Sequence, residues 1–188
     1  MTTDIFFLIK DHHTDKKLAY FYNYCLVTFC AKILVLVVDL KKISIDGSAK
    51  TPQIDLNHLN GELIFSGRSI PENAAELYED VLSWVHEYIK NPRQITNLRL
   101  NLEYFNTASS IWLAKIVKAL STIDNSEDTL LIHLYFNIEE FDSMGSEDIK
   151  DALSPIIDII GATMLSIGVK IYGTDPQGQV MKESMVLI

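Results

Sequence analysis

Cysteine and cationic side chains are both scarce in this chain of 188 residues. The two cysteines, Cys25 and Cys30, lie in the N-terminal segment, so the rest of the sequence offers no disulfide, no thiol chemistry and no cysteine metal site. The 16 lysines and arginines are outnumbered by 25 aspartates and glutamates, which gives a net charge of −9. Binding to DNA or RNA relies on cations that neutralise phosphates, so this composition predicts that nucleic acid is not a partner.

Motifs that would indicate an enzyme are also missing from the sequence. A catalytic centre needs a nucleophile with its base, a metal cluster or a loop that cradles phosphate. Outside the N-terminal segment, His58, His86 and His133 are not paired at metal-ligand spacing. The stretch Gly67-Arg68-Ser69 has too few glycines for a phosphate loop. We therefore predict no enzymatic activity, no catalytic residue, no cofactor and no metal site.

Hydrophobic periodicity predicts strands and helices that alternate from residue 51 onward. Apolar residues at every second position indicate strands, and apolar residues three and four apart indicate helices. The predicted strands cover residues 51–56, 62–67, 95–104, 129–137 and 168–173, and predicted helices begin near Asn73, Asn106 and Ser146. His133 lies opposite the apolar row of its strand, which predicts an exposed or half-buried structural histidine. The order β-β-α-β-α-β-α-β predicts an α/β fold with a mixed sheet and helices mainly on one face.

The junction between the strand at 95–104 and the following helix is rich in hydroxyl groups. The apolar row of the strand, which runs from Leu98 to Tyr104, ends just before the helix start at Asn106-Thr107. Either of these residues can cap the helix, which leaves the Thr107 hydroxyl at the positive end of the helix dipole. A phosphoryl group there would bring about two negative charges to a position that favours anions. The spacing by itself favours the simpler interpretation that Thr107 and Ser109 are ordinary helix caps.

Two motifs in this sequence resemble those of a known family. The first is Arg68-Ser69-Ile70-Pro71-Glu72-Asn73, and an acidic helix with Leu77-Tyr78-Glu79 follows it. The second, further along the chain, is Leu102-Glu103-Tyr104-Phe105-Asn106-Thr107-Ala108-Ser109-Ser110. Together they resemble the SiaC family of bacterial regulatory phosphoproteins, over residues 43–137. Two motifs in the same order are much more specific than either motif alone. The resemblance therefore favours a phosphorylation site at Thr107 over the simpler interpretation of an ordinary helix cap.

The resemblance implies a cytoplasmic protein with a STAS-like fold, similar to the anti-sigma-factor antagonists. In this family a threonine in the second motif is phosphorylated by a dedicated protein kinase and restored by a PP2C-type phosphatase. The unphosphorylated form binds and activates a diguanylate cyclase, which places the family in cyclic-di-GMP and biofilm signalling. Carried onto this chain, the phosphoacceptor is Thr107. Ala108 departs from the family, where serine is common, and removes one competing acceptor.

The resemblance also divides the chain. It implies a regulatory domain over residues 43–175 and a C-terminal tail over residues 176–188, with residues 1–42 as a hydrophobic N-terminal extension. Residues 18–38 have the length of a membrane span, but Lys32 lies within them and lysines flank both ends. Because no methionine occurs between Met1 and Met144, we interpret the extension as upstream sequence from a misassigned start near Leu40. A membrane anchor and a packed or cleaved extension are the alternatives.

We therefore interpret the chain as a non-enzymatic switch protein whose partner binding depends on phosphorylation of Thr107. The residues expected at the partner-binding surface are Arg68, Pro71, Glu72, Asn73, Asn106, Ser109 and Ser110. Arg68 could contact the phosphate or could pair with a carboxylate such as Glu103. An anti-sigma-factor antagonist and a membrane-tethered scaffold are the alternative functions, and a membrane contact is expected only if the N-terminal extension is genuine.

Overall fold

The computed structural model describes residues 40–187, apart from the side chains of residues 146, 150–152 and 155. The predicted N-terminal extension therefore lies almost wholly outside the described residues. The strands are β1 (Ile43–Ile45), β2 (Gln53–Asn57), β3 (Glu62–Ser69), β4 (Ile95–Phe105), β5 (Thr129–Asn137), β6 (Ser166–Thr174) and β7 (Val180–Leu187). The helices are α2 (Ala74–Tyr88), α3 (Thr107–Leu120), α4 (Ile138–Ser143) and α5 (Ser146–Ile160). None of these helices has both the length and the apolar character needed to cross a membrane.

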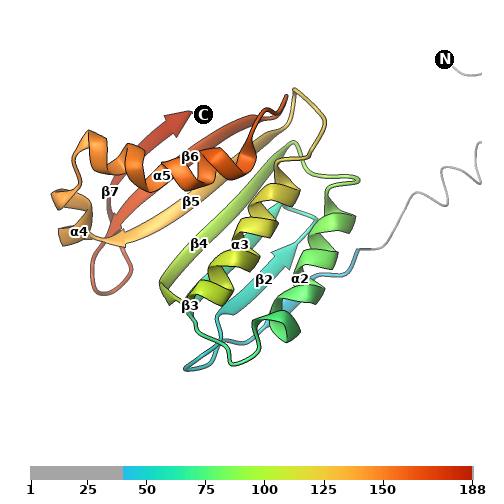
Figure 1. Ribbon diagram of the computed structural model, residues 1–188, viewed down its shortest axis with the longest axis horizontal. Coiled ribbons are helices and arrows are strands. Elements are labelled where there is room, and N and C mark those ends of the chain that lie inside the picture. The colour runs from blue at the N-terminus through green and yellow to red at the C-terminus, as the bar shows by residue number, and fades with distance from the viewer. Residues whose placement is uncertain (1–39, 188) are drawn as a thin grey trace, which may run out of the picture. The chain divides into compact units, whose positions relative to one another are not determined.

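The strands form one seven-stranded sheet in which every strand lies beside its neighbours in the sequence. Strands β3 to β6 are parallel, whereas β1, β2 and β7 pair antiparallel at the two sides. Each parallel pair is joined by a helical crossover, and crossovers of the same hand place their helices on the same face of a sheet. Figure 1 shows α2, α3 and α5 lying along one face of the strands.

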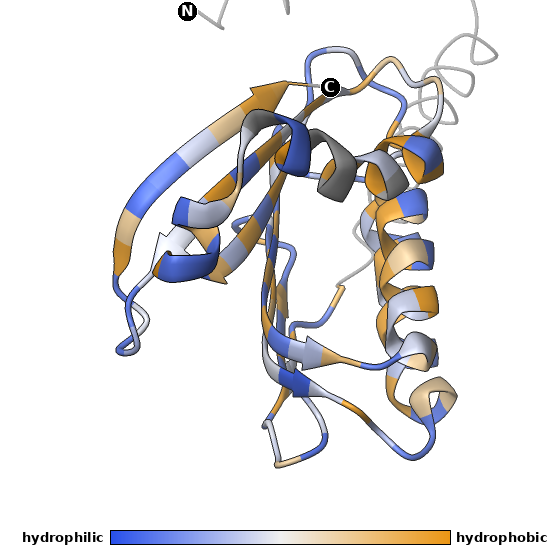
Figure 2. Cartoon of the chain, turned by 60° about the vertical axis from the view of Figure 1, so that its left-hand side comes forward, coloured by the Kyte–Doolittle hydropathy of each residue, from blue (hydrophilic) through white to orange (hydrophobic). Residues whose placement is uncertain are grey.

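The core lies between this face of the sheet and the helices. Hydrophobic and hydrophilic residues alternate along the strands (Figure 2), so each strand sends one row of apolar side chains toward the helices. Leu98 of β4 and Ile132 of β5 are fully buried in this layer, as is Ile116 of α3. A fully buried side chain of this size contributes about 1.5–3 kcal/mol. The same packing fixes where each strand ends and where each helix begins.

The predicted mixed α/β fold with helices on one face is confirmed, and the structure adds three elements to the predicted order. Strand β1 is only three residues long, which is too short for its alternation to be recognised. Helix α4 has six residues and no buried side chain, so it carries no apolar stripe. The segment predicted as a C-terminal tail contains β7, whose polar centre Lys182-Glu183-Ser184 hides the strand pattern.

Strands β2 and β3 form a hairpin, and its turn depends on Gly61. Strand β2 pairs antiparallel with β3, and Gly61 has φ of +73°. A Cβ atom at Gly61 would collide with the carbonyl oxygen of Ile95 at the start of β4. Glycine is therefore required for two reasons, the left-handed backbone and the close approach of a neighbouring strand.

Candidate functional site

The junction between β4 and α3 has the geometry of a capped helix start. Asn106 is the N-cap residue, with φ of −86° and ψ of 172°, and its side-chain oxygen accepts a hydrogen bond from the Ser109 amide at 2.9 Å. Thr107 is the first residue of the helix and is exposed to solvent. Its hydroxyl therefore lies where the unpaired amides of the first turn and the helix dipole favour an anion.

The three hydroxyl groups of the junction have different surroundings. Ser109 is fully buried, and its Oγ donates to the Ser69 carbonyl oxygen at 3.0 Å. Ser110 is half-buried, and its Oγ donates to the Thr107 carbonyl oxygen at 2.8 Å. Within the described part of the chain the Thr107 hydroxyl has no hydrogen-bond partner. Of these three hydroxyl groups, only that of Thr107 is both accessible and unbonded. The prediction that Ser109 lies on the partner-binding surface needs correction, because Ser109 is buried.

A buried chain of hydroxyl groups joins the junction to the two neighbouring elements. The Ser69 Oγ at the end of β3 donates to the Ser109 Oγ at 2.8 Å and lies 2.7 Å from the Tyr78 hydroxyl of α2. Burial raises the pKa of the Tyr78 phenol, so it stays protonated near neutral pH. The Asn106 amide also donates to the Ser69 carbonyl oxygen at 3.0 Å. These bonds fix the start of α3 against β3 and α2.

The first motif lies partly beside this junction and partly at the start of α2. Arg68 pairs with Tyr104 across the strands and is exposed, and within the described residues it makes no ion pair with Glu103 or any other carboxylate. Pro71 is buried, so it offers little surface for the predicted contact with a partner. The exposed Glu72 bonds to Lys50 at 2.6 Å, which holds the pKa of its carboxyl below the usual value.

Asn73 acts mainly through the helix that it begins. Its side chain caps α2 and accepts a hydrogen bond from the Glu76 amide at 3.4 Å. Asn106 performs the same task for α3, and both helices start at the carboxyl ends of adjacent parallel strands. The structure therefore places Asn106 next to Thr107 along the chain and Arg68 opposite Tyr104 across the strands, whereas Pro71, Glu72 and Asn73 build the neighbouring helix start.

A β-bulge changes the facing of side chains at the end of β4. Gly67 has φ of +88°, and the register with β3 shifts there, so Glu103 is the extra residue between the pairs Gly67–Leu102 and Arg68–Tyr104. The predicted inward position of Tyr104 is wrong, because the bulge breaks the alternation and leaves Tyr104 55% exposed. Phe105 is 47% exposed and Ile111 is 53% exposed. We call Tyr104, Phe105, Thr107 and Ile111 the junction patch.

A second polar cluster lies on the face of the sheet opposite the helices. His133 is 3% exposed rather than exposed or half-buried, which corrects the sequence prediction. Its Nδ1 faces the Arg99 guanidinium at 3.3 Å, and its Nε2 lies 2.9 Å from the Asn97 side-chain oxygen. Arginine can only donate, so the histidine is neutral with its proton on Nε2. Burial, together with the nearby charges of Arg99 and Lys170, lowers the pKa of His133 to about 4.

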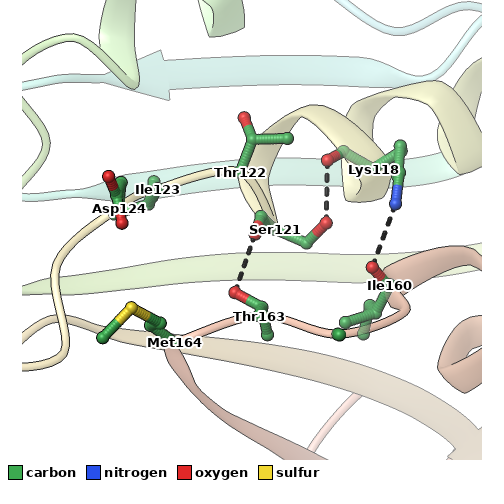
Figure 3. A pocket seen from close by; sticks show the side chains of 9 residues that line it. Lys118, Ser121, Thr122, Ile123, Asp124, Ile160, Thr163 and Met164 are labelled. Atoms are coloured by element: carbon green, nitrogen blue, oxygen red, sulfur yellow. Dashed lines mark hydrogen bonds between the residues drawn. The ribbon is translucent and has the colours of Figure 1, made fainter.

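A cleft of about 530 Å³ lies at the opposite end of α3 from Thr107 (Figure 3). Lys118 Nζ donates to the Ile160 carbonyl oxygen at 3.0 Å, and Thr163 Oγ1 donates to the Ser121 carbonyl oxygen at 3.0 Å. Its polar groups thus tie the ends of α3 and α5 together, which indicates a structural role. Among the described residues, no group of three or more histidine, cysteine, aspartate or glutamate side chains could hold a metal ion.

The model of one protein family, described as the SiaC family of regulatory phosphoproteins, matches residues 45–160, which is more than half of the chain. The chain belongs to the SiaC family. The match contains both sequence motifs, the capped start of α3 and the buried hydroxyl chain beneath it.

Several relatives from Pseudomonas aeruginosa resemble this SiaC-family chain. An uncharacterized protein of strain UCBPP-PA14 is 34% identical over 70 residues, which cover 37% of this chain and 56% of that protein. The chain therefore matches little more than half the length of that curated relative. The crystal structure of apo-SiaC has a TM-score of 0.51 and 25% identity, with 59% of this chain and 92% of that chain covered.

A third similar structure is that of SiaC bound to a partner. It is the crystal structure of the diguanylate cyclase SiaD in complex with its activator SiaC, and it matches with a TM-score of 0.54. The identity is 21%, with 69% of this chain and 99% of that chain covered. At this identity the similarity establishes a shared fold.

Sequence reasoning missed two residues of this SiaC-family site, Ser69 and Tyr78. Both stand inside the stretches on which the resemblance depends, but neither position was assigned a role. A serine at the end of a strand and a tyrosine on the apolar face of a helix give no signal individually. Their link to Ser109 becomes visible only when β3, α2 and α3 are packed together.

Proposed function

We propose that this chain is a non-enzymatic, cytoplasmic regulatory protein in which reversible phosphorylation of Thr107 switches the binding of a partner. The observation that carries the proposal is the difference among the three hydroxyl groups of the junction. Thr107 is exposed and unbonded, whereas Ser109 is buried and Ser110 bonds back to the helix. Membership of a family of regulatory phosphoproteins supports the same assignment. Residues 43–175 are the proposed regulatory domain.

The proposed partner is a diguanylate cyclase, in cyclic-di-GMP and biofilm signalling. Support comes from the similar structure in which SiaC of Pseudomonas aeruginosa is bound to such an enzyme as its activator. A protein kinase would add the phosphate and a PP2C-type phosphatase would remove it. Thr107 is accessible at a helix end, as a substrate of either enzyme must be.

The junction patch explains how phosphate could control this partner. Tyr104, Phe105 and Ile111 lie within four residues of Thr107 in the chain, and their large hydrophobic side chains remain exposed. A partner that covers them gains from burial of apolar surface. Phosphorylation adds about two negative charges within the same patch, and a partner must then desolvate those charges to keep the contact. The unphosphorylated form is therefore the proposed binding form.

Affinity capture from the source cells with Thr107→Ala and Thr107→Glu forms of the full chain tests this proposal. We expect the Ala form to recover a diguanylate cyclase and the Glu form to recover at least about tenfold less, because the carboxylate places a charge in the patch. Ser83→Ala, which removes an exposed hydroxyl from α2, is the matched control and should behave like the unmodified chain. Recovery of an anti-sigma factor in place of a cyclase would indicate the transcriptional alternative and overturn the proposed partner.

Mass spectrometry of the protein isolated from its own cells tests the phosphorylation site directly. We expect phosphate on Thr107 and none on Ser109. Phosphate confined to Ser109 or Ser110, or absent from this junction under all growth conditions, would overturn the assignment. The same spectra give the mature N-terminus, which tests the predicted start near Leu40 and the alternative of a membrane-tethered scaffold.

A further inference from the structure

The sheet forks next to the junction patch. Strand β4 pairs with β5 only from Ile95 to Leu100, which lie opposite Thr129 to Leu134. Beyond this point the end of β4 stays paired with β3, and the end of β5 stays paired with β6. Figure 1 shows the ends of β4 and β5 diverging. The two strand edges that face the fork therefore do not satisfy each other's backbone amide and carbonyl groups.

A cleft of about 540 Å³ occupies the fork. Four aromatic side chains contribute to its walls, and two carboxylates lie at its rim. These residues are Tyr104, Phe105, Tyr135, Phe136, Glu103 and Glu140. We call this space the β4–β5 cleft. Its volume is within the range of specific binding sites, and open strand edges are templates for pairing with an added strand.

Among the described residues, the side chains that line the cleft include two carboxylates and no lysine or arginine. Glu103 and Glu140 are both exposed, and within the described residues neither has an ion-pair partner. The nearby Lys182 is already bonded to Asp142 at 2.7 Å. The chain as a whole carries a net charge of −9, which adds to the potential at the cleft. An occupant with lysine or arginine side chains is therefore favoured over an acidic one.

We propose that the β4–β5 cleft binds an extended, basic peptide segment of a partner protein. The segment would bond to the open edges of β4 and β5 as an added strand, its apolar side chains would pack on the aromatic walls, and a lysine or arginine would pair with Glu103 and Glu140. Apolar walls alone would suit many ligands, but open strand edges together with two free carboxylates select a basic chain in strand conformation. The identity of that partner as a cyclase rests on the proposed function, whereas the peptide preference does not.

Binding of defined peptides to the full chain tests the inference. The probe is a fluorescent hexapeptide of alternating valine and lysine, and its counterpart has glutamate in place of lysine. We expect the unmodified chain to bind the lysine peptide and not the glutamate peptide. The double variant Glu103→Gln/Glu140→Gln should bind the lysine peptide about fivefold more weakly than the unmodified chain does. The matched control is Glu79→Gln/Asp80→Asn, which removes two exposed carboxylates from α2. Equal binding to both double variants would overturn the inference.

Hydrogen exchange locates the bound peptide. We expect the lysine peptide to slow exchange of amides in residues 101–105 and 135–137, and to leave α2 unchanged. Slowing confined to other residues would overturn the inference. Slow exchange of these amides in the free chain would also overturn it, since the cleft would then be covered by the chain itself or, if the protection depends on concentration, by a second copy.

The two proposals can fail separately. Thr107→Glu is expected to reduce recovery of the cyclase but not to weaken binding of the lysine peptide, because Thr107 is not among the residues that line the cleft. If no cyclase is recovered while the peptide binds the cleft, the partner assignment fails and the cleft inference stands. If the cyclase responds to Thr107 while the peptide binds both double variants equally, the cleft inference fails and the switch stands.

Discussion

At the scale of single residues, the most unusual environment is that of His133. It lies on the face of the sheet that none of the described helices covers, and it is buried because neighbouring side chains enclose it. The ring stacks on Tyr172 with centroids 5.7 Å apart, and Arg99 closes the site while held by Glu62 at 2.6 Å. A proton on Nδ1 would face the guanidinium directly, so protonation is opposed by charge as well as by burial.

This environment predicts that His133 destabilises the folded state in acid. The pKa is about 4 in the folded chain, below the value of about 6.5 in unfolded chains. As pH falls the unfolded state binds the proton first, so stability is complete above about pH 6.5 and is lost as pH approaches 4. Between these limits we expect His133→Gln to lose about 3 kcal/mol less stability than the unmodified chain, because one unit of pKa difference corresponds to about 1.4 kcal/mol.

Urea unfolding followed at several pH values measures this difference. His86→Gln is the matched control, because it removes an exposed histidine from α2. The same slope of stability against pH for the unmodified chain and for His133→Gln would contradict the assignment of a neutral, buried imidazole.

At the scale of elements, two glycines with the same backbone conformation occupy turns with different surroundings. Gly61 has φ of +73° and Gly178 has φ of +80°. A Cβ atom at Gly178 would have no neighbour within 4 Å, whereas one at Gly61 would collide with β4. Gly178→Ala should therefore cost only the backbone strain, about 1 kcal/mol.

Gly61→Ala should cost about 2–4 kcal/mol, because displacement of β4 adds to the backbone strain. Denaturant unfolding of the two variants gives both values under the same conditions. Equal losses of stability would show that the approach of β4 to the hairpin turn does not constrain this position.

Elements with a long apolar pattern were predictable from the sequence, and those that depend on pairing were not. The cores of β4, β5, α2 and α3 were predicted because their own side chains cover the hydrophobic layer. Strand β7 was missed because pairing with β6 stabilises it despite its polar centre. Tyr104 was misplaced because a bulge requires two strands, and a single strand gives no signal of it.

In the candidate site, too, the features set by the local sequence were predictable, and those set by contacts between distant residues were not. The helix start and its cap followed from the local sequence, because Asn106 bonds within three residues of itself. The burial of Ser109 did not, because it depends on Ser69, which is 40 residues away in the sequence. The assignment of Thr107 as phosphoacceptor came from the family resemblance, and the accessibility of its hydroxyl adds an independent physical reason.

At the scale of the whole described unit, stability should decrease from the centre of the sheet toward its two sides. Strands β4 and β5 each have a partner on both sides and bury Leu98, Leu130 and Ile132 completely. Strand β1 has three residues, and β7 has no buried residue. Regions with few buried apolar contacts open with little free energy.

Hydrogen exchange of the free chain should reflect this gradient. We expect amides at residues 95–100 and 129–134 to exchange at least about a hundredfold more slowly than those of β1 and β7, since central strands open only with global unfolding. Uniform protection across the sheet would contradict this expectation. It would indicate that the outer strands are covered in solution.

The hydroxyl bonds at the start of α3 have a consequence for enzyme specificity. A synthetic peptide that spans residues 104–112 would present Thr107, Ser109 and Ser110 to a kinase as three equivalent acceptors. The folded chain presents one, because Ser69 has engaged the second and the helix backbone has engaged the third. If the proposed phosphorylation takes place, the tertiary structure of the chain selects the acceptor, and the kinase needs to recognise a shape rather than a short sequence.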